Sequence, residues 1–327
     1  MPLRSQFPVN SVLLYDSALN QHPFFRTWKK HFSHQLQLKA GEKLKTLESF
    51  SQTLKKLAAI KIPQTQDLTF VAVGGGSVGD FVGFLASTFL RGRSFVQIPS
   101  TWLAAVDSAH GGKNGLNFQG TKNQIGTVFL PDRVYLIQQL LQSQPQARYE
   151  DALGEVLKIA IINTPAVLPK LTTLKKVKIY KLLPSLIHSK LKIVKSDPFE
   201  KKGNRRLLNL GHTIGHVLES YFSLTHGHAV KLGILFSARW SFHRGHLKEK
   251  DFIQIWNTIH QLEKSDLQIH LKNLSITAAK KLLLKDKKLI SSHEVDFIFV
   301  QKIGKVFRQK VTVQSVIDEI HRQKTEF

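Results

Sequence analysis

The clearest candidates for chemistry form a row of polar residues in the segment RRLLNLGHTIGHVLE. Arg205, Asn209, His212 and His216 are spaced by four, three and four residues, and a helix places residues at this spacing on one face. Leucine, isoleucine and valine flank the row, so this face would be buried, and buried polar groups require partners. Two interpretations stay open: a hydrogen-bonded core helix, and one wall of a metal and substrate site.

A histidine pair at i, i+4 binds a metal when a further ligand joins it, and two segments offer that ligand. The sequence THGH contains His226 and His228, and DALGEVLKIAII contains Glu155 and Lys158. An exposed ion pair would explain the last two residues equally well. If Glu155 is instead buried among its apolar neighbours, it needs a cation. A metal held by Glu155, His212 and His226 would supply one and would keep open positions for catalysis.

A glycine-rich turn follows the strand-like run DLTFVAV and precedes the helical run FVGFLASTFL. The turn, GGGSVGD, includes Gly75, Gly76, Ser77 and Asp80. Glycine lets the backbone approach a pyrophosphate, and the start of a helix favours its negative charge. The turn therefore indicates a dinucleotide site, with a plain tight turn as the alternative.

Cationic and amide side chains gather in the glycine-rich stretch between residues 101 and 127. They are Lys113, Asn117, Lys122 and Asn123. The stretch is too long for a simple connection, and such loops are usually functional or disordered. Loop lysines are commonly solvated. Together with Asp107, Arg205 and a metal, however, these groups would hold a substrate that carries both a phosphate and a carboxylate.

The elements that must position these side chains fall into two halves. We expect strands at SVLLYD, DLTFVAV, SFVQIPS and RVYLI, and helices at LKTLESFSQTLKKLAAI and FVGFLASTFL. Strand, glycine turn and helix together are typical of an α/β sheet with ligands at the strand ends. Beyond residues 142–148 helical patterns dominate, and VDFIFVQKIGKVFRQKVTV predicts a hairpin. The sequence predicts a Rossmann-like α/β dinucleotide-binding domain at 1–147 and a mainly α-helical metal- and substrate-binding domain at 148–327.

Composition narrows the classes of function. A length of 327 residues suggests two domains. The net charge of +24 favours anionic partners. The absence of cysteine excludes disulfides, thiolate metal sites and a cysteine nucleophile. No apolar run approaches the ~20 residues of a membrane span and no leader is evident, so we expect a cytoplasmic protein without a membrane partner. No nucleic-acid-binding pattern is visible, and the lysines of residues 170–202 are expected to be solvated.

The ordered set of these segments resembles the 3-dehydroquinate synthase family. The matching segments are GGGSVGDFVGFLASTFLRGRSFVQIPSTWLAAVDSAHGGKNGLN, GTKNQIG, GEVLK, RRLLNLGHTIGHVLE, HGHAV and DKK. The likeness is strong at residues 71–126 and 197–233. The resemblance implies a dehydroquinate synthase-like fold, NAD and a divalent metal, with zinc as the expected ion and cobalt as an alternative. It also implies a homodimer in which Arg91 of one subunit reaches the active site of the neighbouring subunit.

The resemblance assigns roles residue by residue. It makes Glu155, His212 and His226 the metal ligands. The groups near the substrate hydroxyls are Asp107, Lys158 and Lys190. The phosphate-side groups are Lys113, Asn209, His216 and Lys288, with Lys287 as an alternative to Lys288. The carboxylate-side groups are Lys122, Asn123 and Arg205. The cofactor-binding groups are Glu42, Lys45, Gly75, Gly76, Ser77, Asp80, Ser100, Thr101, Lys113 and Lys122.

The implied reaction converts 3-deoxy-D-arabino-heptulosonate 7-phosphate into 3-dehydroquinate and phosphate. It proceeds by transient NAD-dependent oxidation, phosphate elimination, re-reduction and intramolecular aldol closure. One departure stands out, because the family's HGE is His226-Gly227-His228 here, which loses a carboxylate and makes His228 a competing ligand. The alternatives are a polyol or alcohol dehydrogenase of the glycerol dehydrogenase type, another sugar-phosphate cyclase, and a binding protein without turnover that uses its charge on nucleic acid.

Overall fold

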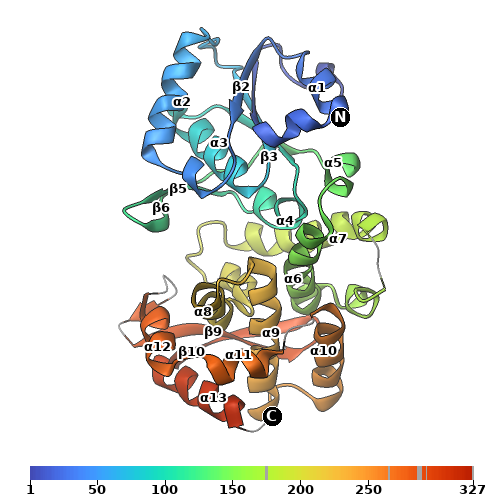
Figure 1. Cartoon of the computed structure of the whole chain (residues 1–327), viewed down its shortest axis with the longest axis vertical. Helices are drawn as coiled ribbons and strands as arrows, with labels where there is room; N and C mark the ends of the chain where they lie inside the picture. The colour runs from blue at the N-terminus through green and yellow to red at the C-terminus, as the bar shows by residue number, and fades with distance from the viewer. Residues whose placement is uncertain (174–175, 264–265, 286–288, 292, 326–327) are drawn as a thin grey trace. The chain divides into compact units, whose positions relative to one another are not determined.

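The computed structural model describes residues 1–173, 176–263, 266–285, 289–291 and 293–325. The chain divides into two compact units, Met1–Arg148 and Tyr149–Phe327, and Figure 1 shows the elements of each. The fold class predicted from the sequence is confirmed: a parallel sheet with helices in the first unit and a mainly helical second unit. Among the described helices, none combines the length and the apolar character that a membrane span requires.

The N-terminal unit is built on a five-stranded parallel sheet of order β2-β1-β3-β4-β7. The strands are β1 Ser11–Asp16, β2 His34–Leu38, β3 Thr69–Gly74, β4 Ser94–Pro99 and β7 Arg133–Val134. Strands β1, β3 and β4 are almost continuously buried, as expected for a parallel sheet covered by helices. The strand predicted at RVYLI is only two residues long, since β7 is an edge strand and the chain continues into a helix at Gln138.

The helices of this unit are α1 Pro23–Lys29, α2 Leu47–Ala59, α3 Gly76–Thr88, α4 Trp102–Val106 and α5 Gln138–Gln142, with short 3-10 turns at Arg4–Gln6, Ser17–Gln21, Glu42–Leu44, Phe89–Arg91 and Ser108–His110. Helix α3 packs closely because it presents two glycines four residues apart. A Cβ atom on Gly79 would lie 1.9 Å from Nε2 of Gln97, and one on Gly83 would lie 2.1 Å from Oδ1 of Asn114. The two glycines therefore let α3 lie close to Gln97 in β4 and to Asn114.

The stretch expected to be one long polar loop contains regular structure. Helix α4 lies in it, and so does an antiparallel hairpin of β5 Lys113–Phe118 and β6 Thr121–Val128. Gly115 and Gly126 pair across the hairpin, and a Cβ atom on either would lie within 2.7 Å of the opposite strand's carbonyl oxygen. Glycines that suggest a loop in the sequence thus permit close backbone contact between two strands.

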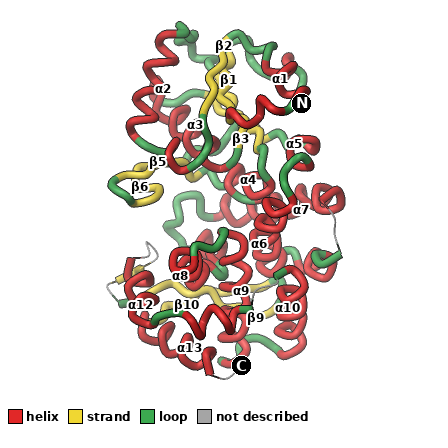
Figure 2. The backbone as a smooth tube through the Cα atoms, in the orientation of Figure 1, coloured by secondary structure: helices red, strands yellow, loops and turns green. Residues whose placement is uncertain are grey.

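The C-terminal unit surrounds a small antiparallel sheet with helices, and Figure 2 shows the two kinds of element. The helices are α6 Gln146–Asn163, which begins just before the unit boundary, α7 Lys176–Ser196, α8 His212–Phe222, α9 His226–His243, α10 Glu249–Leu262, α11 Leu267–Asn273, α12 Ile276–Lys285 and α13 Val313–Thr325, with 3-10 turns at Pro165–Lys170 and Asn204–Asn209. The strands are β8 Leu289–Ser291, β9 Glu294–Lys302 and β10 Lys305–Thr312. The predicted hairpin is confirmed as β9 and β10. Helix α9 contacts β9 and is buried along most of its length.

Candidate metal and substrate site

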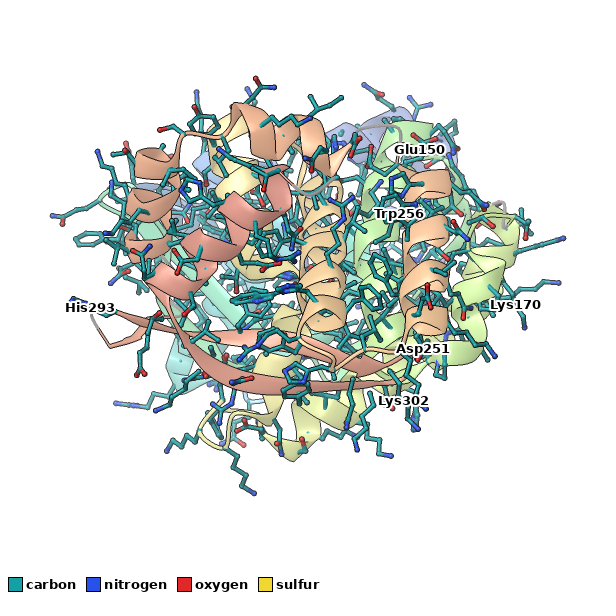
Figure 3. The ribbon with its side chains drawn as sticks, turned by 90° about the horizontal axis from the view of Figure 1, so that it is seen from below. Glu150, Lys170, Asp251, Trp256, His293 and Lys302 are labelled. Atoms are coloured by element: carbon teal, nitrogen blue, oxygen red, sulfur yellow. The ribbon has the colours of Figure 1, made fainter. Side chains whose placement is uncertain are left out.

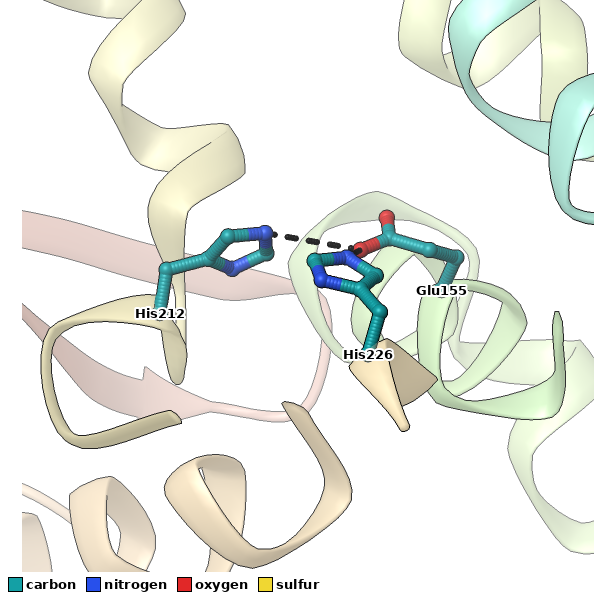
Figure 4. A group of neighbouring side chains, drawn as sticks. All are labelled: Glu155, His212 and His226. Carbon is teal, nitrogen blue, oxygen red and sulfur yellow. Dashed lines mark hydrogen bonds and ion pairs between the residues drawn. The ribbon is translucent and has the colours of Figure 1, made fainter. Parts of the chain in front are cut away.

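Three side chains from three helices of the C-terminal unit form one cluster. Glu155 of α6, His212 of α8 and His226 of α9 each offer a ligand atom, and these atoms lie within 4.8 Å of one another. Oε1 of Glu155 is 3.5 Å from Nε2 of His212 and 3.2 Å from Nε2 of His226. Figure 4 shows both imidazoles directed at the carboxylate. The sequence places these residues far apart, so the fold assembles the cluster.

The single helix expected from Arg205 to His216 is wrong. The chain forms a 3-10 turn at Asn204–Asn209, and α8 begins only at His212. Gly211 separates them with a φ of 78°, and a Cβ atom there would lie 2.7 Å from the backbone nitrogen of Ile234 in α9. This close contact requires glycine and ends the periodicity. His212 and His216 still share one helix, and their ring centroids are 5.4 Å apart.

Glu155 and Lys158 are buried, so the exposed ion pair considered above is excluded. Glu155 is 0% exposed and Lys158 is 3% exposed. Nζ of Lys158 lies 2.5 Å from Oε2 of Glu155. One carboxylate oxygen therefore pairs with the ammonium group, and the other faces the two imidazoles. An ion pair buried to this degree must be well compensated to be stable.

The hydrogen bonds of the two histidines fit a metal. Nδ1 of His212 lies 3.1 Å from the carbonyl oxygen of Leu210, and Nδ1 of His226 lies 3.2 Å from Oε2 of Glu219. Acceptors at Nδ1 hold a hydrogen there, so Nε2 is the ring atom of each histidine that faces Glu155 and that a metal would bind. Two imidazoles and one carboxylate are a donor set that suits zinc and similar divalent ions.

The electrostatics of His226 also indicate a site that favours a cation. Burial by itself lowers the pKa of His226, but the carboxylates of Glu155 and Glu219 raise it to about 10. The imidazole between two carboxylates thus favours a positive charge at this point. A divalent ion at the same place would serve the same electrostatic need.

His228 does not join the cluster in the described residues. Its Nε2 is 3.4 Å from Oε1 of Glu263, whose other oxygen lies 2.7 Å from Nζ of Lys231. The ring of His228 also lies edge-on to His270, with centroids 5.8 Å apart. Burial lowers the pKa of His228. The competing ligand expected from the altered HGE segment is therefore directed to a different group of side chains.

Arg205 is held by the segment that precedes it. The guanidinium donates to the carbonyl of Pro198 over 2.7 Å, and the side chain is buried. The carboxylate of Asp197 accepts the backbone N–H groups of Lys202 and Arg205. Burial raises the pKa of Asp197, but these backbone donors outweigh it and hold the pKa below its usual value. Asp197 therefore organises the turn that carries Arg205.

A second group of predicted residues meets in the N-terminal unit. Nζ of Lys45, which is 3% exposed, donates to Oδ2 of Asp80 over 2.6 Å and also to Oδ1 of Asn123. Burial raises the pKa of Asp80, and Lys45 opposes that effect. Asn117 connects the hairpin to Glu42 by a hydrogen bond of 2.7 Å. Asn123, assigned to the substrate carboxylate, thus contacts Lys45, a residue assigned to the cofactor.

The glycine turn lies directly before the first turn of helix α3. Gly75 precedes α3, and the hydroxyl of Ser77 accepts the backbone N–H of Gly41 over 3.0 Å. The backbone nitrogen of Ser100 donates to Gly74 over 2.8 Å, which brings the end of β4 beside the turn. A Cβ atom on Gly75 would approach Cγ2 of Thr101 to 3.1 Å. The turn, Ser100 and Thr101 therefore adjoin one another.

The remaining predicted residues occupy varied positions. Lys113, Lys122 and Arg91 are exposed, Asp107 follows α4, Gly76 begins α3, Lys190 is buried on α7 and Asn209 ends the 3-10 turn before α8. Lys287 and Lys288 lie outside the described residues. Figure 3 shows Lys170 extending outward from the surface, as expected for solvated lysines in residues 170–202, whereas Lys190 in the same stretch is buried.

Sequence reasoning missed two carboxylates that contact His226 or its neighbour. Glu219 is the first, and Asp151 is the second, since its Oδ1 accepts the backbone N–H of Gly227 over 2.7 Å. A Cβ atom on Gly154 would lie 2.3 Å from the carbonyl oxygen of Gly227. Helices α6 and α9 are therefore in backbone contact beside the cluster. The sequence offered one signal for these residues, which is helical spacing from a ligand. Glu219 follows His212 by seven residues, and Asp151 precedes Glu155 by four.

Comparison with known proteins identifies the fold class first. The structure matches a solved structure of 2-deoxy-scyllo-inosose synthase, complexed with carbaglucose-6-phosphate, NAD+ and Co2+, with a TM-score of 0.82 and 21% identity over 97% of this chain and 93% of that one. At this identity the match establishes the fold alone, which this chain shares with that synthase.

The family follows from the sequence. The model of the 3-dehydroquinate synthase N-terminal family matches residues 35–151, and that of the C-terminal family matches residues 152–289. A 3-dehydroquinate synthase of Acetivibrio thermocellus is 33% identical over 86% of this chain and 79% of its own length. A bifunctional shikimate kinase/3-dehydroquinate synthase of Thermotoga maritima is 33% identical over 81% of this chain, which spans about half of that relative (54%). The chain belongs to the 3-dehydroquinate synthase family.

Proposed function

We propose that the protein is a 3-dehydroquinate synthase. It converts 3-deoxy-D-arabino-heptulosonate 7-phosphate into 3-dehydroquinate and phosphate, a step of the shikimate pathway toward aromatic amino acids. The observation that carries the proposal is the cluster of Glu155, His212 and His226, in which Lys158 neutralises the carboxylate and both imidazoles present Nε2. Family membership supplies the substrate. A cytoplasmic location is part of the proposal, because NAD and sugar phosphates are cytoplasmic metabolites.

The cofactors belong to the proposal as well. Glu155, His212 and His226 would hold a divalent metal, zinc as the expected ion, and the glycine turn before α3 would hold NAD. When bound, the metal supplies Lewis acidity toward a substrate hydroxyl, and NAD supplies reversible hydride transfer. Lys45 and Asp80, joined over 2.6 Å, would fix the segment beside the cofactor's adenosine. Glu42, Ser100 and Thr101 complete that set.

The protein's own side chains would bind and orient the substrate. Arg205 and Lys122 would neutralise its carboxylate, and Lys113, Asn209, His216 and Lys288 its phosphate, while Asp107, Lys158 and Lys190 would lie near its hydroxyls. The buried guanidinium of Arg205 is supported in its position by Pro198 and Asp197. Side chains positioned in this way lower the entropic cost of the cyclisation. The leaving phosphate itself would accept a proton, because the assigned groups are mainly cationic.

A homodimer with Arg91 shared across its interface is the quaternary part of the proposal. Arg91 is exposed and ends the 3-10 turn Phe89–Arg91 that follows α3. Leu90, Arg91 and Gly92 all have positive φ, at 48°, 64° and 114°. Non-glycine residues in this region cost free energy and are often found at functional sites. Such a turn would present the guanidinium to a neighbouring subunit.

One assay separates this function from the alternatives. The protein is incubated with the heptulosonate phosphate, NAD and zinc, and both phosphate and NADH are followed. We expect phosphate release without net NADH. His212→Ala should abolish turnover, and the exposed Asp318→Asn in α13 is the control. Net NADH from a polyol would favour the dehydrogenase. No turnover, together with salt-sensitive oligonucleotide binding, would favour the binding protein.

A further inference from the structure

The two imidazoles of the cluster are held by unlike acceptors. Nδ1 of His212 faces a neutral backbone carbonyl, that of Leu210, at 3.1 Å. Nδ1 of His226 faces a carboxylate, that of Glu219, at 3.2 Å. Glu219 lies on α8, whereas His226 begins α9, so this contact joins two of the three helices that supply the cluster. The difference between the acceptors gives Glu219 an effect on His226 that Leu210 does not have on His212.

We infer that Glu219 is a positioning residue that fixes His226 as an Nε2 ligand and increases the retention of the metal. The inference rests on the proposed metal centre. A carboxylate that accepts the Nδ1 hydrogen orients the ring and makes Nε2 a stronger base toward a cation. Glu219 lies at Nδ1 of His226, whereas Glu155 lies at Nε2, so Glu219 acts on the metal through the imidazole.

The position of His226 makes it the ligand that most needs such support. It is the first residue of α9, and its side chain is 29% exposed, whereas that of His212 is 11% exposed. Fewer packing contacts therefore restrict the ring of His226. Asp151 holds the backbone of its neighbour Gly227, and Glu219 holds the Nδ1 edge of the ring while Nε2 faces Glu155.

The test measures zinc affinity, not turnover. Full-length wild type, Glu219→Gln and Glu219→Ala are stripped of metal and titrated with zinc against a chelator. We expect Glu219→Ala to bind zinc about 10- to 100-fold more weakly. Glu219→Gln keeps a neutral acceptor comparable to the one that serves His212, so it should fall between wild type and Glu219→Ala. Glu249→Gln, an exposed carboxylate at the start of α10, is the charge-matched control and should match wild type.

Thermal unfolding of the metal-free proteins separates positioning from a structural role. Glu219 is partly exposed, so we expect its loss to change the free energy of unfolding of the metal-free protein by less than it changes the free energy of zinc binding. Zinc affinity of Glu219→Ala within twofold of wild type would overturn the inference. The inference would also be overturned if Glu219→Ala lost as much free energy of unfolding without metal as free energy of zinc binding, because the role of Glu219 would then be structural. His212→Ala distinguishes this inference from the proposed function. If that variant binds zinc with full affinity, Glu155, His212 and His226 are not the ligand set, and the metal centre of the proposed function is refuted.

Discussion

Replacing Gly154 by alanine should damage the metal cluster more than it damages the fold. The new Cβ atom would lie 2.3 Å from the carbonyl oxygen of Gly227 and 2.7 Å from its Cα. Both neighbours are backbone atoms, so no side chain can rotate away. Restoring an ordinary contact of 3.4 Å requires α6 and α9 to separate by about 1 Å. Glu155 follows Gly154 directly and His226 precedes Gly227, so the separation acts on two ligands.

Two opposing effects set the change in stability. Alanine is a better helix former than glycine by about 1 kcal/mol. Overpacking costs about 1–3 kcal/mol. The free energy of unfolding should therefore fall by only about 0–2 kcal/mol. Metal ligation tolerates far smaller displacements than the fold does, since metal–ligand distances vary by only about 0.2 Å. A displacement of about 1 Å should weaken zinc binding at least tenfold and lower kcat by about 100-fold.

The assay pairs zinc titration with urea denaturation of the same samples. Gly215→Ala in α8 is a graded control, because its Cβ atom would meet the carbonyl oxygen of Ala229 at 3.1 Å. We expect that variant to lose less than threefold in zinc affinity. If Gly154→Ala binds zinc and turns over as wild type does, then the backbone contact between α6 and α9 does not position the ligands, and the reasoning fails.

Three further predictions concern charged groups. Lys45→Met leaves the carboxylate of Asp80 without its buried cation, so the free energy of unfolding from urea denaturation should fall by about 3 kcal/mol. Fluorescence titration should show NAD binding weakened at least tenfold. Unchanged values for both would contradict the role of the pair. Arg205→Ala should raise KM for the substrate at least tenfold with a smaller change in kcat, whereas an unchanged KM would remove Arg205 from the carboxylate site. Asp197 has a lowered pKa, so its stabilisation is present above pH 3.8 and is lost as the pH falls through its folded value. Wild type should therefore exceed Asp197→Asn in stability at pH 7, the difference should shrink as the pH falls below 3.8, and a constant difference would refute the assignment.

Local patterns in the sequence predicted the regular elements well. Strands β1, β3 and β4 and helices α2 and α3 fall where alternation, helical spacing and glycine turns indicated them. The hairpin of β9 and β10 was also predicted correctly, because KIGK separates two β-rich runs. These signals are local, so they survive without knowledge of the tertiary structure.

The predictions of secondary structure that were wrong involve glycines that are required by tertiary contacts. The 4-3-4 spacing from Arg205 to His216 imitates a helix, but Gly211 ends it because α9 passes too close for a side chain. Gly115 and Gly126 suggest a loop, yet they pair within a hairpin. In each case the decisive atoms lie on another segment, and a single sequence does not show that distance.

The candidate site shows the same division. The resemblance nominated Glu155, His212 and His226, and the structure brings them together. It did not nominate Glu219 or Asp151. Asp151 meets Gly227 from 76 residues away, and that contact exists only after α6 and α9 pack.

The spread of the ligands along the chain links metal binding to folding. Glu155 and His226 are 71 residues apart, and no unfolded chain holds them together. A bound ion would therefore act as a removable cross-link among α6, α8 and α9, present only in the folded C-terminal unit. At free zinc 100-fold above its Kd, that unit gains about 2.7 kcal/mol. Chelation would thus lower the melting temperature of the C-terminal unit, which calorimetry would measure.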